Sequence, residues 1–238
     1  SLDATVTDFA RELRVMMRCS ERLFISQVET GLVGGLGVSA RYYPYRPVGA
    51  VRERLLNIRR NRTCETGHPY LFLLLGSASH ITTRDSVEWF LREMVSSNLP
   101  KSVQVMVVGS QSEQFLSFAQ SIENLQVRGW VSQNELDHLL VRCAGVLAPQ
   151  HRGFGALTRL SELSCAGIPV IVSQHAALAM DVPPGVFTTE DTWDEWSQMI
   201  VKLTSPNNAL CLSCSLSSYL AWEASQPNPL PSLIKKLQ

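Results

Sequence analysis

Between residues 70 and 205 the chain alternates short, continuously apolar runs with segments whose apolar residues recur every three or four positions. The short runs have the pattern of strands buried on both faces, and the periodic segments have the pattern of amphipathic helices. The predicted strands cover residues 70–75, 103–108, 125–127, 145–148, 169–172 and 186–187, and the predicted helices cover 86–94, 114–120, 135–141, 157–165 and 192–203. This alternation, with its short connections, predicts an α/β fold in which helices cover both faces of a parallel sheet.

The residues before this region follow a different pattern. Apolar side chains at near-helical spacing predict an amphipathic helix over 4–18, and residues 23–26 are expected to form a short strand. The glycine-rich stretch 31–37 lacks the spacing of a phosphate-binding loop, so we expect a flexible turn there. Two prolines within 42–47 predict extended chain, because each proline disfavours the helical conformation of the residue before it.

The composition restricts the function. Lys and Arg number 21 and so do Asp and Glu, which disfavours a general nucleic-acid binder. No apolar run reaches the ~20 residues of a membrane span, and the first residues lack the pattern of a signal peptide. The six cysteines are expected to be mostly buried free thiols of a cytoplasmic protein, and Cys211 and Cys214 lack the second pair that a zinc ribbon needs.

One predicted helix, over residues 51–62, is unusually basic. It contains five arginines and one glutamate beside four apolar residues. The simpler interpretation is a linker helix with a solvated face. The alternative is that Arg52–Arg62 form a patch for anionic lipid, which would place the protein peripherally at the inner face of the membrane, or for a phosphate-bearing acceptor.

The segment after the strand 145–148 carries the most informative chemistry. A Gly153-x-Gly155 turn is expected to open a helix, and the free N–H groups of a helix start attract anions. Arg152 and Arg159 flank the turn, and arginine is suited to bidentate contacts with phosphate. Glu162 follows Arg159 by three positions and can share its helix face. This pattern indicates a nucleoside diphosphate, or else an ordinary surface Arg–Glu pair.

The same segment resembles the signature of GT-B glycosyltransferases similar to family 4. The resemblance covers about residues 68–205 and implies a Rossmann-like, doubly wound parallel sheet, the C-terminal nucleotide-sugar-binding half of such an enzyme. It implies that Gly153, Gly155, Arg152 and Arg159 hold the pyrophosphate and that Glu162 holds the ribose. It also divides the chain into residues 1–66, the tail of an acceptor domain with an inter-domain linker, and residues 67–238, the donor-binding domain with C-terminal helices.

Two further stretches are similar to the family pattern. Residues 75–80 resemble its first strand and glycine loop, and residues 127–131 resemble the loop that holds the nucleobase. His151 follows a predicted strand, where ligands of such sheets bind. The candidate donor-binding residues are therefore Gly76, Ser77, Ser79, His80, Trp130, Val131, His151, Arg152, Gly153, Phe154, Gly155, Arg159 and Glu162.

Three departures from the family pattern matter. The first of its two glutamates is absent, so that Arg152 or Phe154 takes its place depending on the alignment. The usual Arg and Lys after the first strand are missing, which leaves more of the positive charge to Arg152 and Arg159. The chain is also shorter than the two halves of a GT-B enzyme together, so we expect it to lack most of the acceptor half.

The resemblance implies a metal-independent hexosyltransferase, with no cofactor beyond a UDP- or GDP-linked sugar, that acts on a hydroxyl of a glycan or lipid-linked acceptor. The sequence contains no Asp-x-Asp motif. Catalytic residues are not identified, and this chain alone is expected to bind the donor with little or no turnover. The alternatives are a non-catalytic, degenerate GT-B half that acts as a binding or partner module, and part of a sugar-nucleotide epimerase.

Overall fold

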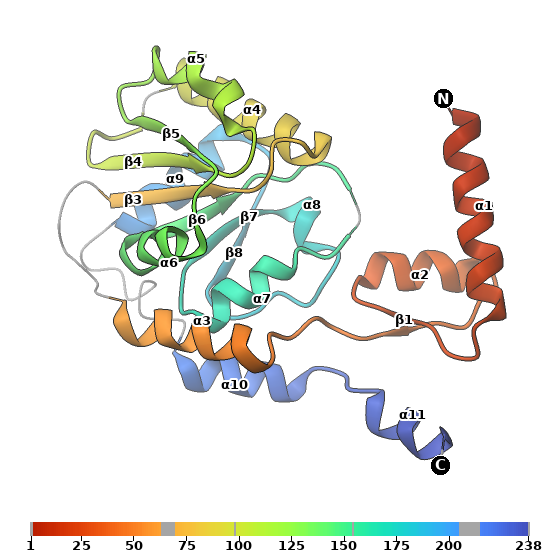
Figure 1. The fold of residues 1–238 in the computed structure, drawn as a ribbon. Helices are drawn as coiled ribbons and strands as arrows, with labels where there is room; N and C mark the ends of the chain where they lie inside the picture. Colours follow the sequence, from red (N-terminus) through yellow and green to blue (C-terminus); the bar gives the residue numbers. More distant parts are fainter. Residues whose placement is uncertain (1, 63–69, 98, 154, 205–214, 238) are drawn as a thin grey trace.

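The computed structural model describes residues 2–62, 70–97, 99–153, 155–204 and 215–237. At its centre lies a six-stranded parallel sheet with the strand order β5-β4-β3-β6-β7-β8 (Figure 1). The strands are β3 (Tyr70–Leu75), β4 (Val103–Val108), β5 (Leu125–Gly129), β6 (Gly145–Ala148), β7 (Val170–Ser173) and β8 (Val186–Thr189). The first three strands extend the sheet in one direction and the next three in the other, which is the Rossmann-like, doubly wound order. The predicted fold class is confirmed.

Helices cover both faces of this sheet. The helices of this region are α4 (Ile81–Ser96), η1 (Ser112–Phe115), α5 (Leu116–Ala119), α6 (Gln133–Arg142), α7 (Thr158–Cys165), α8 (Gln174–Ala177) and α9 (Trp193–Thr204). Two buried clusters result, one with side chains of α6 and α7, the other with side chains of α4 and α9. Leu73 points into the first cluster and its neighbours Phe72 and Leu74 into the second, as the alternation of a strand requires.

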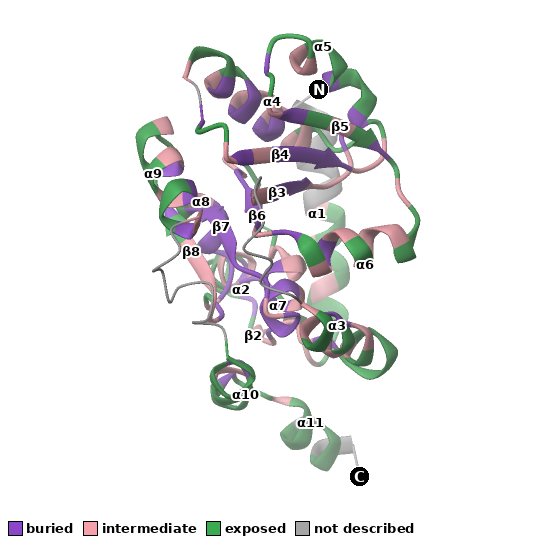
Figure 2. Cartoon of the chain, turned by 90° about the vertical axis from the view of Figure 1, so that its left-hand side faces the viewer, coloured by how far each residue is buried: buried purple, intermediate pink, exposed green. Residues whose placement is uncertain are grey.

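Figure 2 shows buried residues gathered on the central strands and on the helix sides that face them. Because both faces of a strand such as β4 are covered, five of its six residues are buried. Continuous apolar runs are therefore the pattern that this sheet needs, and the sequence has it.

The basic helix α3 (Gly49–Asn61) is part of this domain's core. Leu55 and Ile58 are 1% and 2% exposed within the first cluster. Arg59 donates to the carbonyl oxygens of Cys165 (2.7 Å) and Ser164 at the end of α7, and the Arg62 guanidinium donates to Leu140 (2.7 Å) and Cys143 at the end of α6. The arginines thus satisfy carbonyl groups that helix ends leave without an intrahelical partner.

The other arginines of α3 include two that form ion pairs. Arg52 forks onto both oxygens of Glu223 at 2.5 and 2.9 Å, and Arg54 lies 3.3 Å from Asp137. Four of the five arginines of Arg52–Arg62 therefore contact the rest of the fold. Contact of this helix with a membrane remains a prediction.

The N-terminal part contains α1 (Leu2–Arg18), β1 (Leu23–Phe24), α2 (Gln27–Gly35) and β2 (Arg41–Tyr42), and lies beside the sheet domain (Figure 1). β1 and β2 pair in parallel. The expectation of a flexible turn at residues 31–37 is wrong, because most of that stretch belongs to α2. The hydroxyl of Ser26 accepts from the Glu29 N–H at 3.2 Å, and this N-cap starts a helix despite the glycines.

The C-terminal helices α10 (Leu216–Ser225) and α11 (Leu230–Leu237) run back from the sheet domain toward the N-terminal part (Figure 1). The aromatic side of α10 buries Tyr219 completely in the first cluster. Beyond α10, Arg46 donates to the Gln226 carbonyl at 2.8 Å, and Arg41 lies 3.4 Å from the Ser232 hydroxyl. The end of the chain therefore contacts the segment that enters α3.

Two sequence expectations concern features outside the sheet. None of the described helices has the length and apolar character to cross a membrane. Among the described cysteines, Cys143 and Cys165 are buried free thiols, whereas Cys19 is exposed. Cys64, Cys211 and Cys214 lie outside the described residues.

Candidate functional site

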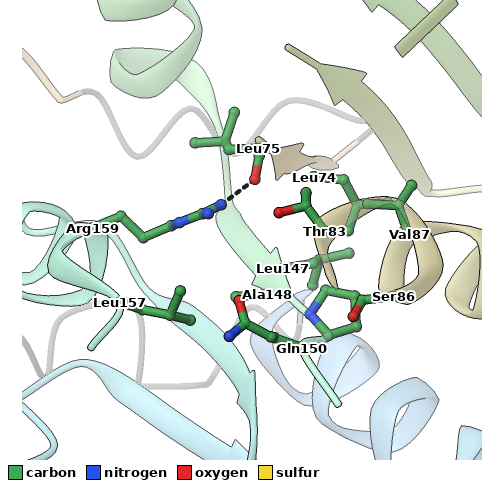
Figure 3. Close-up of a pocket in the computed structure, with 11 residues that line it drawn as sticks. Leu74, Leu75, Thr83, Ser86, Val87, Leu147, Ala148, Gln150, Leu157 and Arg159 are labelled. Atoms are coloured by element: carbon green, nitrogen blue, oxygen red, sulfur yellow. Dashed lines mark hydrogen bonds between the residues drawn. The ribbon is translucent and has the colours of Figure 1, made fainter. Parts of the chain in front are cut away.

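The strand order reverses between β3 and β6, which are neighbours in the sheet. In doubly wound sheets ligands bind in the crevice at this point, beyond the carboxyl ends of the strands. A hollow of about 20 Å³ lies here, room for about one water. Its lining residues are Leu74, Leu75, Thr83, Ser86, Val87, Leu147, Ala148, Pro149, Gln150, Leu157 and Arg159 (Figure 3).

Arg159, in the first turn of α7, is the charged residue of this lining. Its Nη1 donates to the carbonyl oxygen of Leu75, the last residue of β3 (Figure 3). Burial lowers the pKa of the guanidinium, and the charge of Glu162 acts in the opposite direction. None of the ion pairs among the described residues includes Arg159. The crevice therefore holds a partly buried positive charge without a carboxylate in direct contact.

Glycines bring the backbone close to this charge. A Cβ on Gly76 would lie 3.3 Å from Nη1 of Arg159 and 2.7 Å from the Thr83 methyl group. On the next strand, a Cβ on Gly109 would lie 1.8 Å from the carbonyl oxygen of Gly76. A side chain at either position would collide with these atoms. Glycine at both positions therefore allows the strand ends to lie close to each other and to Arg159.

Glu162 is held by a residue from the distant linker segment. The hydroxyl of Tyr45 donates to Oε1 of Glu162 at 2.6 Å. Burial raises the pKa of Tyr45 to about 12, and the Glu162 carboxylate adds to this shift because it accepts a hydrogen bond from the protonated phenol. Glu162 is half-buried and is not among the residues that line the hollow.

The loop that follows β6 crosses toward α4. Arg152 is exposed and pairs with Asp85 of α4 at 3.4 Å, and it does not join Arg159 in the lining. A Cβ on Gly153 would lie 3.7 Å from the Thr82 methyl group of the same helix. Around Gly155 the space is open, with nothing within 4 Å of its Cβ position. Phe154 lies outside the described residues.

His151 faces away from the hollow. Its Nδ1 lies 3.0 Å from the Asp191 carboxylate, and its ring meets Trp89 edge-on at a centroid distance of 4.2 Å. His175 contacts the same loop, because its Nε2 lies 2.9 Å from the Gly153 carbonyl oxygen. Both imidazoles thus hold the loop after β6 to its surroundings.

Hydroxyl groups gather at the ends of β3 and β4. The hydroxyl of Ser77 lies 2.6 Å from those of both Ser79 and Ser110. Sequence reasoning missed Ser110, although Gly109-Ser110 repeats the Gly76-Ser77 pattern one strand further on. It also missed Thr83 and Ser86, which line the hollow from α4.

Three candidates lie at the margins. His80 precedes α4 and is exposed. Trp130 follows β5 and is 72% exposed, so its indole is open to a ligand or partner. Val131 is half-buried against the cluster that contains α6. The structure therefore brings Gly76 and Arg159 together and places serine hydroxyls at the ends of β3 and β4. His151 and Arg152 contact other parts of the fold.

A Rossmann-like domain with its crevice at the switch between β3 and β6 is one half of the architecture of GT-B glycosyltransferases, and the structural neighbours belong to that class. HepE from Anabaena, in complex with UDP and glucose, matches with a TM-score of 0.61 at 12% identity, over 89% of this chain and 62% of that one. WaaG, a glycosyltransferase involved in lipopolysaccharide biosynthesis, matches with a TM-score of 0.59 at 15% identity, over 90% and 61%. TarM matches with a TM-score of 0.67 at 10% identity, over 97% and 45%.

At these identities the matches establish the fold. The chain spans about three fifths of the length of HepE and WaaG and less than half of TarM. No model of a protein family matches the sequence, and a search of curated proteins finds no match.

Proposed function

We propose that this chain is the donor-binding half of a glycosyltransferase that resembles family 4. The diphosphate of a UDP- or GDP-linked hexose would lie at the carboxyl ends of β3 and β6, beside Arg159. The observation that supports this most strongly is the Arg159 guanidinium in the crevice, which contacts a backbone carbonyl and no carboxylate of the described residues. A partly buried guanidinium without a carboxylate partner is unfavourable, and an anionic ligand would compensate its charge.

The chemistry follows from the position of this charge. When the acceptor hydroxyl displaces the diphosphate, the bond between the anomeric carbon of the sugar and the diphosphate oxygen breaks, and negative charge develops on the leaving diphosphate. A guanidinium beside the diphosphate in a partly buried site stabilises that charge more than water does. The first turn of α7 lies at the hollow, since Leu157 and Arg159 line it, and the start of a helix carries the positive end of its dipole. We propose that transfer is metal-independent. A second domain would bind the glycan or lipid-linked acceptor whose hydroxyl receives the sugar.

Arg159 must move for a donor to bind. Its Nη1 is bonded to Leu75, and the remaining hollow is about 20 Å³. A diphosphate would replace the Leu75 carbonyl as the partner of Arg159, since a charged acceptor forms the stronger hydrogen bond.

The same closed crevice favours the alternative that the chain is a non-catalytic GT-B half. In that case Arg159 would remain on Leu75, and the module would contribute contacts to a partner in place of donor binding. The two functions make opposite predictions for nucleotide binding.

Isothermal titration calorimetry of the 238-residue chain with UDP, GDP and ADP tests the proposal. We expect one nucleoside diphosphate to bind, and Arg159→Gln to weaken its binding by roughly 30-fold or more, the effect of removing a charged hydrogen-bond donor. Glu162→Ala should weaken it by roughly tenfold. Arg92→Gln is the matched control, because Arg92 is exposed and, among the described residues, its ion pair is with Glu88 one helical turn away.

The outcome separates the candidates. Binding that Arg159→Gln abolishes and Arg92→Gln leaves unchanged supports a donor site. If none of the three nucleotides binds the wild type, the donor-binding function is wrong and the non-catalytic module stands.

A further inference from the structure

Arg159 and Glu162 have the spacing of an intrahelical ion pair, but that pair does not form. Residues three positions apart on a helix are surface neighbours, and an Arg–Glu pair at this spacing is favourable. In this structure Arg159 turns into the crevice toward Leu75, and Glu162 turns toward Tyr45. The charges are still near enough for Glu162 to oppose the lowering of the Arg159 pKa.

Tyr45 is the residue that holds the two charges apart. It belongs to the extended segment between β2 and α3, 117 positions before Glu162. Its hydroxyl engages Oε1 at 2.6 Å, a short bond of the kind formed with a charged acceptor. No other hydrogen bond of the Glu162 carboxylate is found within the described residues, so Tyr45 alone fixes its direction.

We propose that Tyr45 is a positioning residue of the donor site: by anchoring Glu162 it prevents an ion pair with Arg159, so that Arg159 can exchange Leu75 for the diphosphate, and it leaves Oε2 of Glu162 for a ribose hydroxyl. This inference rests on the proposed function. Without the Tyr45 hydroxyl, Glu162 would swing toward Arg159, the only opposite charge one turn away on its own helix. The ion pair formed would compete with the ligand for the guanidinium.

A double-mutant cycle tests this role, with the nucleoside diphosphate that binds the wild type as the ligand. We expect Tyr45→Phe to weaken binding roughly fivefold, the effect of a competing ion pair at a half-buried site. In a Glu162→Gln background the same substitution should change the dissociation constant less than twofold, because a neutral amide does not pair with Arg159. A role of Tyr45 in stability alone would give equal losses in both backgrounds.

Tyr43→Phe is the matched control. It removes a hydroxyl from the same segment, and no hydrogen bond of the Tyr43 hydroxyl occurs within the part of the chain that the structure describes. Its nucleotide affinity should equal that of the wild type. The melting temperature of each variant shows that it is folded.

The failures are distinguishable. If the wild type binds a nucleotide but Tyr45→Phe binds it equally well, or loses the same factor with Glu162 and with Gln at position 162, this inference is overturned and the donor site stands. If the wild type binds none of UDP, GDP and ADP, the proposed function and this inference are both wrong.

Discussion

Gly109 and Gly76 touch through their backbones at the carboxyl ends of two neighbouring strands. The position of a Cβ on Gly109 is 1.8 Å from the carbonyl oxygen of Gly76. That carbonyl belongs to the residue that directly follows Leu75, the present partner of Arg159. The close approach of the strands and the shape of the crevice therefore depend on the same residues.

Gly109→Ala should be among the most destabilising single substitutions in the chain. The methyl group would overlap backbone atoms that cannot rotate away, and the φ of +153° is unfavourable for a side chain. We expect a loss of about 3 kcal/mol or more in the free energy of unfolding, measured with denaturant. Gly34→Ala in α2, with nothing within 4 Å, should be neutral or stabilising by about 0.5–1 kcal/mol. Equal stabilities of the two variants would contradict this account.

Arg59 should contribute to stability far more than its neighbour Arg60. Arg59→Met removes two charge-assisted hydrogen bonds to the end of α7 and leaves the carbonyl groups of Ser164 and Cys165 without that donor. We expect a loss of about 2–3 kcal/mol, again from denaturant unfolding. Arg60 is exposed, and Arg60→Met should stay within about 0.5 kcal/mol of the wild type. If both substitutions cost the same, capping by Arg59 is not the reason for the loss.

The raised pKa of Tyr45 predicts that the free energy of unfolding falls at alkaline pH. Its pKa is about 12 in the folded chain against an ordinary value of 10.0, so the folded state holds the phenolic proton over that interval and the unfolded state does not. The stability that this group contributes is present below pH 10 and is lost as the pH rises through about 12. Tyr45→Phe should flatten the decline of the unfolding free energy in that window. The absorbance of tyrosinate should show one fewer tyrosine titrating near pH 12 in Tyr45→Phe than in the wild type. If the two titration curves are the same, the hydrogen bond of Tyr45 does not raise its pKa.

The strands of the sheet were predictable because burial on both faces leaves a continuous apolar run. Residues 70–75 and 103–108 match β3 and β4 residue for residue. Helix α2 was not predictable in this way, since its three glycines disfavour a helix. The N-cap of Ser26 offsets part of that cost, and the burial of Val33 and the hydrogen bond from Gln27 to Asp181 are contacts that the sequence pattern does not show. Local propensity is a weak guide where a cap and tertiary contacts decide.

The candidate site shows the same limit. The position of Arg159 in the crevice could be predicted from the sequence, because the switch point of such a sheet gathers strand ends. The bond between Tyr45 and Glu162 could not be found, since it joins residues 117 positions apart and replaces the local pair that the helix spacing favours. Sequence spacing describes neighbours along one element, whereas the crevice is made by contacts between elements.

The attachment of α3 defines how much of the chain forms a self-sufficient folding unit. Leu55 and Ile58 complete the apolar cluster under the sheet, and Arg59 and Arg62 close the ends of α7 and α6. A recombinant fragment that started at residue 67 would expose that cluster to solvent. It would also lack the two arginines that donate hydrogen bonds to the carbonyl oxygens at the ends of α7 and α6. The shortest autonomous piece of the sheet domain must therefore begin no later than Gly49.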